Sequence, residues 1–226
     1  VDAYGEWFKR AIDEPVPEGV EHLCHGGRPE LVDVDAWKGL LRLGAEYAHS
    51  IRDWDRELLF REGELAFMEL PERGQALMQM ARRASEDLCV AETALHYVEQ
   101  ALDSGVRDEV SLKLGYQLAS ELERMDSYFD LLDARIRQQA DLSEPILRMA
   151  AELASDVLDR PDVAAEHYRT LLTIDCDEVA VLAVLDKALT EAGEDVERLA
   201  VIARRAELAE GEEQSFLYQA LASLSM

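Results

Sequence analysis

The residues best suited to bind a metal ion form one short group, His22-Leu23-Cys24-His25. A structural zinc site has four nitrogen or sulfur ligands and normally takes its second pair from a recognisable spacing along the chain. The other three histidines, His49, His96 and His167, fall in different predicted helices and do not complete such a set. The sequence therefore predicts no metal site and no other cofactor, with residues 22–25 forming part of a loop.

Catalytic motifs are absent from the sequence. It contains no Gly-rich phosphate loop, no Ser-x-x-Lys, no His-Glu-x-x-His and no Gly-x-Ser-x-Gly. Carboxylates are so numerous that no pair stands out as a general acid and base. We therefore expect a protein that is not an enzyme, and an unusual enzyme or metal protein built on residues 22–25 is the alternative of that class.

The three cysteines, Cys24, Cys89 and Cys176, are an odd number and lie far apart in the sequence. This distribution argues against a disulfide framework and favours a reducing compartment, so we predict a cytoplasmic location. Cys89 and Cys176 are expected to be packing residues near helix ends. No stretch approaches the roughly 18 consecutive apolar residues of a membrane span, because charged residues recur every few positions.

The charge balance restricts the partners that the protein can have. Forty-eight acidic and 23 basic residues give a net charge of −25 and a pI near 4.4. Nucleic-acid binders need a basic stripe that displaces counterions, so we expect no nucleic-acid partner. A protein or peptide partner with basic or mixed charge fits this field better.

Helix is predicted along almost the whole chain. Apolar residues recur at intervals of three and four, and no stretch alternates with period two. Pro71, Pro145 and Pro161 stand at predicted helix starts, while Gly105 and Gly193 follow predicted helix ends. The predicted helices cover residues 2–13, 34–50, 55–70, 73–87, 90–104, 108–123, 127–139, 143–158, 162–174, 177–192, 195–209 and 213–224.

A period of about 35 residues is present in the second half of the chain. One column of equivalent positions consists of Leu112, Leu147, Leu182 and Leu217. A second column, which Gly44 and Ala81 extend upstream, consists of Gly115, Ala150, Leu185 and Ala220. Columns that repeat in phase indicate a repeated helix pair.

The segment Leu43-Gly44-x-x-Tyr47-Ala48 resembles the first-helix signature of the tetratricopeptide repeat family. Ala164, Tyr168 and Leu171 fall at the spacing of that family's second helix. The resemblance implies an all-α, right-handed helical-repeat solenoid of antiparallel helix pairs. It also implies that small residues let the two helices of a pair approach closely. Leu185 stands where a small residue is usual, which leaves a HEAT-like or other irregular helical repeat as the alternative.

Two regions are predicted along the chain. Residues 1–33 form an N-terminal helix and a linker rich in Pro and Gly, and residues 34–226 form a solenoid of about five helix pairs plus a terminal helix. Helix 2–13 carries Tyr4, Trp7, Phe8 and Ile12, and is either a cap or the last helix of a preceding repeat.

The candidate binding site lies on the first helices of successive pairs, which line the concave face in repeat proteins of this family. Positions outside the core are the candidates on predicted helices 108–123, 143–158 and 177–192. The predicted binding residues are Lys113, Tyr116, Gln117, Arg148, Glu152, Asp186 and Lys187.

These observations favour a non-catalytic scaffold or adaptor that binds a peptide or protein partner. The alternative is an accessory or oligomerisation region of a larger, bacterial-like regulatory, secretion or motility protein. Phe216, Leu217, Ala220 and Leu224 form an apolar stripe on the last predicted helix. Self-association through that stripe is a further possibility that the sequence raises.

Overall fold

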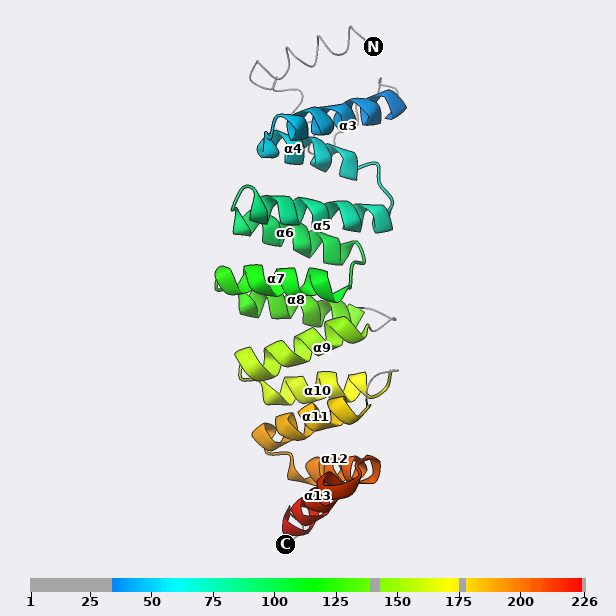
Figure 1. Cartoon of the computed structure of the whole chain (residues 1–226), viewed down its shortest axis with the longest axis vertical. Helices are drawn as coiled ribbons and strands as arrows, with labels where there is room; N and C mark the ends of the chain where they lie inside the picture. The colour runs from blue at the N-terminus through cyan, green and yellow to red at the C-terminus, as the bar shows by residue number, and fades with distance from the viewer. Residues whose placement is uncertain (1–33, 139–142, 175–177, 225–226) are drawn as a thin grey trace. The chain divides into compact units, whose positions relative to one another are not determined.

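The computed structural model describes residues 34–138, 143–174 and 178–224, and every element among them is helical (Figure 1). The helices are α3 (Val34–Ser50), α4 (Trp54–Leu65), α5 (Leu70–Glu86), α6 (Ala91–Asp103), α7 (Glu109–Glu121), α8 (Met125–Gln138), α9 (Glu144–Glu152), α10 (Pro161–Leu171), α11 (Glu178–Ala192), α12 (Asp195–Leu208) and α13 (Gly211–Leu224). A π-helical turn, Leu153–Val157, continues α9. The predicted all-α class is confirmed.

The chain divides into two compact units, Val1–Val106 (unit 1) and Arg107–Met226 (unit 2). Unit 1 contains the pairs α3–α4 and α5–α6, and unit 2 contains α7–α8, α9–α10 and α11–α12, followed by α13. We call the members of each pair its first and second helix. The predicted helix 2–13, its linker, the group at residues 22–25 and Cys176 lie outside the described residues.

Most predicted helix boundaries agree with the structure to within a few residues, but the helix predicted at 55–70 is too long. α4 ends at Leu65, where the N–H of Phe67 donates to the carbonyl of Glu64 over 3.0 Å and tightens the last turn. Leu70 instead opens α5, and Pro71 lies in its first turn, where a missing N–H costs no helical hydrogen bond.

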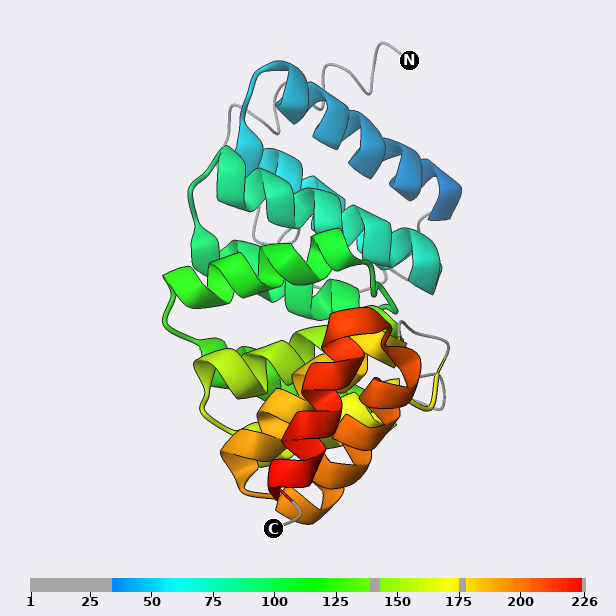
Figure 2. The same ribbon diagram turned by 60° about the horizontal axis from the view of Figure 1, so that its bottom comes forward.

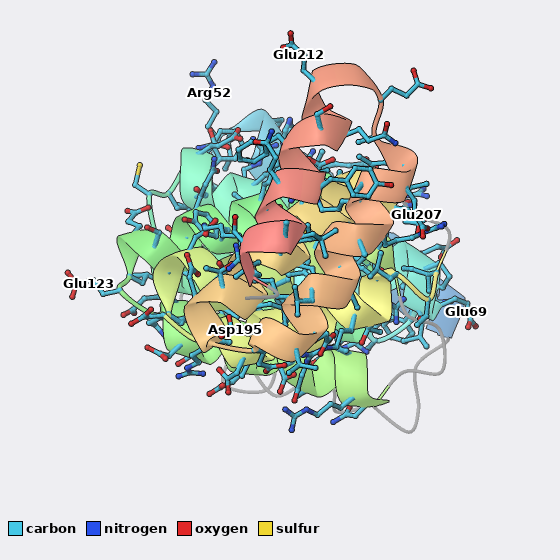
Figure 3. All side chains as sticks on the ribbon, turned by 90° about the horizontal axis from the view of Figure 1, so that it is seen from below. Arg52, Glu69, Glu123, Asp195, Glu207 and Glu212 are labelled. Atoms are coloured by element: carbon cyan, nitrogen blue, oxygen red, sulfur yellow. The ribbon has the colours of Figure 1, made fainter. Side chains whose placement is uncertain are left out.

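The turn inside each helix pair contains one residue in the left-handed backbone region. These residues are Arg52, Cys89, Glu123, Asp159 and Gly193, with φ angles of 58°, 55°, 55°, 53° and 74°. The next residue returns its N–H to a carbonyl in the last turn of the first helix, as Arg124 does to Ala119 over 2.8 Å. Figure 3 shows the labelled side chains of Arg52 and Glu123 extending outward from the ribbon.

The π-helical turn distinguishes α9 from the other first helices. The N–H of Leu158 donates to the carbonyl of Leu153 over 3.0 Å, which is the five-residue spacing of a π-helix. The sequence predicts one continuous helix at 143–158 and does not reveal this extra residue. Asp156 belongs to this π-helical turn.

Close packing inside the pairs depends on the predicted small residues. A Cβ atom at Gly115 would lie 2.5 Å from the hydroxyl of Tyr128, and one at Gly44 would lie 2.8 Å from the ring of Phe60. The buried Tyr128 donates a hydrogen bond to the carbonyl of Leu112 over 3.0 Å, and burial raises its pKa. The first helix thus offers a flat surface to an aromatic ring of the second helix, as the resemblance implies.

α13 packs along α12, and the two helices lie side by side in Figure 2. Leu217 is buried with Ile202 and Ala206, and Leu224 packs at the edge of this cluster. Phe216 instead remains 68% exposed. The predicted apolar stripe is therefore divided, because α12 covers Leu217 while Phe216 lies on another side of the helix.

Candidate functional site

The seven predicted binding residues lie on three first helices of unit 2: α7, α9 and α11. α7 begins after Asp108, whose carboxylate accepts hydrogen bonds from the N–H and the hydroxyl of Ser111 over 3.0 and 2.7 Å. Burial opposes ionisation of Asp108, but these hydrogen bonds prevail and lower its pKa. α9 begins with Pro145 in its first turn. Because α7 begins at Glu109 and α9 at Glu144, Lys113 and Arg148 each lie four residues after the first residue of their helix.

A pocket of about 380 Å³ lies between α7 and α9, and we call it the α7–α9 pocket. Its lining residues are Glu109, Leu112, Lys113, Glu144, Pro145, Arg148, Met149 and Glu152. The structure therefore brings together three of the seven predicted residues, Lys113, Arg148 and Glu152. Leu112, Pro145 and Met149 give the same pocket an apolar part.

Both cations of the pocket form ion pairs within their own helices. Lys113 contacts Glu109 over 2.5 Å, and Arg148 contacts Glu144 over 2.7 Å. The hydrogen bond from Lys113 lowers the pKa of the exposed Glu109. Pairs of this kind, four residues apart on an exposed helix surface, contribute little to stability because solvent screens them. A charged group of a partner can therefore replace either member at little cost.

Glu152 places a carboxylate beside these cations. Partial burial raises the pKa of its carboxyl above the ordinary value, and Arg148 offsets part of this effect. Tyr168 of α10 is buried nearby, and burial together with the Glu152 charge raises its pKa to about 12. The pocket thus presents charges of both signs around an apolar part.

Lys187 of α11 extends the charged surface beyond the pocket. Its Nζ lies 2.8 Å from a carboxylate oxygen of Asp156, in the π-helical turn that follows α9. Both side chains are more than half exposed. Gln117 is exposed on α7 and Tyr116 is half-buried beside it, and neither lines the pocket.

Asp186 has a different position from the other predicted residues. Its carboxylate accepts hydrogen bonds from Nε of Arg198 over 2.9 Å and from Nη1 of Arg205 over 2.6 Å, both on α12. The Asp186 side chain is only 16% exposed. These charge-assisted contacts hold α11 against α12, so Asp186 acts within the helix pair.

A second pocket, in unit 1, was not predicted from the sequence, and we call it the Glu57 pocket. Its volume is about 350 Å³, and it is lined by Glu46, His49, Glu57, Leu58, Arg61, Met68, Ala76, Gln79, Met80 and Arg83. Glu57 is only 6% exposed. A buried carboxylate is costly unless it is paired.

Three helices supply the partners of Glu57. Nδ1 of His49 on α3 lies 3.1 Å from its carboxylate, Nε of Arg83 on α5 lies 3.7 Å from it, and Nε of Arg61 on α4 lies 4.0 Å from it. The Arg83 guanidinium also covers the ring of Trp54, 4.5 Å from the ring centre. The one signal in the sequence was a cluster of Arg and acidic residues around Trp54, which also fits a solvated helix face. The internal pairing accounts for these charges as contacts that join α3, α4 and α5.

Among the described residues, no group of three or more His, Cys, Asp or Glu side chains could hold a metal ion. His49, His96 and His167 lie in α3, α6 and α10.

Cys89 is exposed at the turn after α5, so its prediction as a packing residue is wrong. Across the described segments, no helix combines the length and the apolar character that a membrane crossing requires.

The described residues define an all-α protein built from helix pairs that follow one another along the chain. No protein-family model matches the sequence. No curated protein matches it either. Among solved structures, the chain is similar to one described as the crystal structure of MamA protein, with a TM-score of 0.45 and 11% sequence identity. That likeness covers 77% of this chain and 92% of the other.

Proposed function

We propose that the chain is a non-catalytic scaffold that binds a segment of a protein partner across α7, α9 and α11 of unit 2. The α7–α9 pocket is the observation that supports this proposal, because it joins two cations, three carboxylates and apolar groups on neighbouring first helices. Lys187 continues the charged surface onto α11. Protein interfaces combine apolar anchors with complementary charge in this way.

The residues that line the pocket indicate the kind of partner that we propose. An apolar side chain fits against Leu112, Pro145 and Met149, and flanking acidic groups fit Lys113 and Arg148. A basic group of the partner pairs with Glu152 or with Glu109. A segment with an apolar anchor and charges of both signs satisfies all of these groups, and basic residues elsewhere in the partner suit the net charge of −25.

Charge reversal at the three cations tests the proposal. Partners recovered by affinity enrichment from the native source are titrated against the triple variant Lys113→Glu, Arg148→Glu, Lys187→Glu. We expect binding to weaken at least several-fold, with an unchanged helical circular dichroism signal. The matched control reverses Arg42, Arg137 and Arg204, which are exposed cations on other helices, so that both variants change the net charge equally. Equal weakening in both variants would refute a site on α7, α9 and α11.

Self-association of an accessory region is the second candidate function. Its support is the 68% exposure of Phe216 on α13. A Phe216→Glu variant that loses binding, or dissociates an oligomer in light scattering, while the charge-reversed variant behaves as wild type, would move the site to α13.

A further inference from the structure

α3 exposes a row of apolar side chains along one face. Leu43 and Tyr47 lie in α3, and Ile51 is the first residue after it, with its N–H donating to the carbonyl of Tyr47. The three follow one another at intervals of four residues and are 54%, 38% and 48% exposed. α3 and α4 pack together through the opposite part of α3, where Leu41, Ala45 and Ala48 are buried. The exposed row is therefore a second apolar surface of the same helix.

The same position is buried in other first helices. Tyr47 lies three residues after the small residue Gly44, and the equivalent positions are Ala84 in α5, Leu153 after α9 and Ala188 in α11. These three residues are 0% exposed. In each case the preceding second helix packs on the first helix, as α4 does on α5, α8 on α9 and α10 on α11. Within the described residues, α3 has no such preceding helix.

The sequence before α3 contains the pattern of a second helix. Residues 7–13 read Trp-Phe-Lys-Arg-Ala-Ile-Asp, and residues 97–103 of α6 read Tyr-Val-Glu-Gln-Ala-Leu-Asp. The two segments agree at five of seven positions. They share an aromatic residue followed by an apolar one, then an Ala-aliphatic pair, and a final Asp. In α6 the apolar members of this pattern, Tyr97, Val98, Ala101 and Leu102, are all at most 3% exposed. Residues 7–13 therefore have the side chains that a second helix buries.

We propose that residues 2–13 form a second helix that docks on the row formed by Leu43, Tyr47 and Ile51. Residues 14–33 connect the two, and a random coil of that length has an end-to-end distance of about 25 Å. The 17 residues of α3 extend over a similar length, about 25 Å. A tether of this length gives the docking segment an effective concentration in the millimolar range. In this arrangement a segment of the same chain covers the exposed apolar row of Leu43, Tyr47 and Ile51.

Photo-crosslinking from the exposed row tests the proposal on the full chain. Tyr47 is replaced by p-benzoylphenylalanine, the protein is irradiated, and the crosslinked peptides are identified by mass spectrometry. We expect a crosslink from position 47 to residues 2–13 in a product with the mass of one chain. The same replacement at Tyr218, an exposed tyrosine of α13, is the control and is expected to give no crosslink to residues 2–13. A crosslink between two chains, a crosslink to any other segment, or none at all would overturn the proposal.

Hydrogen exchange of α3 provides the second measurement. Trp7→Ala removes the largest side chain of the docking segment and is expected to raise deuterium uptake in peptides from residues 34–50 at least several-fold. Glu6→Ala is the matched control, because Glu6 aligns with His96 of α6, whose side chain is 63% exposed. Equal uptake in wild type and the Trp7→Ala variant would count against docking of this segment, even if a crosslink were found.

Discussion

Among the residues that the structure describes, four that carry side chains have positive φ angles, and each stands at the turn inside a helix pair. They are Arg52, Cys89, Glu123 and Asp159. The left-handed conformation costs an L-residue about 1–2 kcal/mol relative to the right-handed one. Gly193 occupies the equivalent turn in the pair α11–α12 and avoids this cost. The turn geometry, rather than the residue type, is thus common to the five pairs.

Glu123→Gly is therefore expected to stabilise the protein. The relief of backbone strain exceeds the entropy that glycine adds to the unfolded chain, so we expect a gain of about 0.5–1 kcal/mol in the free energy of unfolding. Glu123 is exposed, and little packing is lost with its side chain. Gly193→Ala is expected to lose about 1 kcal/mol at the equivalent turn. Urea denaturation measures the free energy of unfolding of both variants. If this free energy changed with the same sign in Glu123→Gly and Gly193→Ala, the result would contradict a common turn geometry.

The sequence predicts where the charged residues of the candidate site lie, but not which of them pair. Lys113, Arg148 and Glu152 could be placed on one surface because Lys113 and Arg148 occupy matching positions in consecutive first helices, and Glu152 lies one turn after Arg148. Asp186 and Glu57 could not be assigned in this way. Their partners lie on other helices, such as Arg205 for Asp186 and Arg83 for Glu57, and only the turns between helices determine those contacts.

In the pairs α3–α4 and α7–α8, a small residue on the first helix faces a large one on the second. Gly44 faces Phe60 and Gly115 faces Tyr128. Ala150 occupies the same position in α9 and is 0% exposed. A side chain larger than methyl at this position has no room unless the second helix moves away.

Ala150→Leu is expected to overpack the pair α9–α10 and to lower the free energy of unfolding by roughly 1–3 kcal/mol. Glu121→Gln, on the exposed end of α7, is the control and should change stability by less than about 0.5 kcal/mol. Thermal or urea denaturation measures both. Equal stability of wild type and the Ala150→Leu variant would show that the repeat register is misassigned.

Helix positions could be predicted from the sequence because apolar periodicity and proline positions act locally. The end of α4 and the π-helical turn after α9 could not be predicted from the sequence. A single additional residue, as in Leu153–Val157, leaves the apolar pattern almost unchanged, and its hydrogen bonds depend on the packing of that turn against α10. Leu185 shows the opposite case, since a large residue occupies a small-residue column and is nevertheless 1% exposed.

At the scale of the whole molecule, the excess of acidic residues determines how partners approach. The net charge of −25 attracts basic surfaces over a distance that salt limits to about 8 Å under physiological conditions. Near the α7–α9 pocket, Lys113 and Arg148 interrupt this field, and the carboxylates beside them give the pocket charges of both signs. Long-range attraction favours a basic partner and local recognition favours groups of both signs, which is why a partner of mixed charge suits both steps.

The two compact units are expected to unfold separately, because the stability of a repeat protein is a sum of terms within repeats and between neighbours. All three tryptophans, Trp7, Trp37 and Trp54, precede residue 106, so tryptophan fluorescence reports on unit 1 alone, whereas far-ultraviolet circular dichroism reports on every helix. Ala150→Leu is expected to destabilise unit 2, which contains α9 and α10. In urea, we expect this variant to shift the circular dichroism transition to lower concentration and to leave the fluorescence midpoint unchanged. Transitions that move together by the same amount would show instead that the chain unfolds as one cooperative structure.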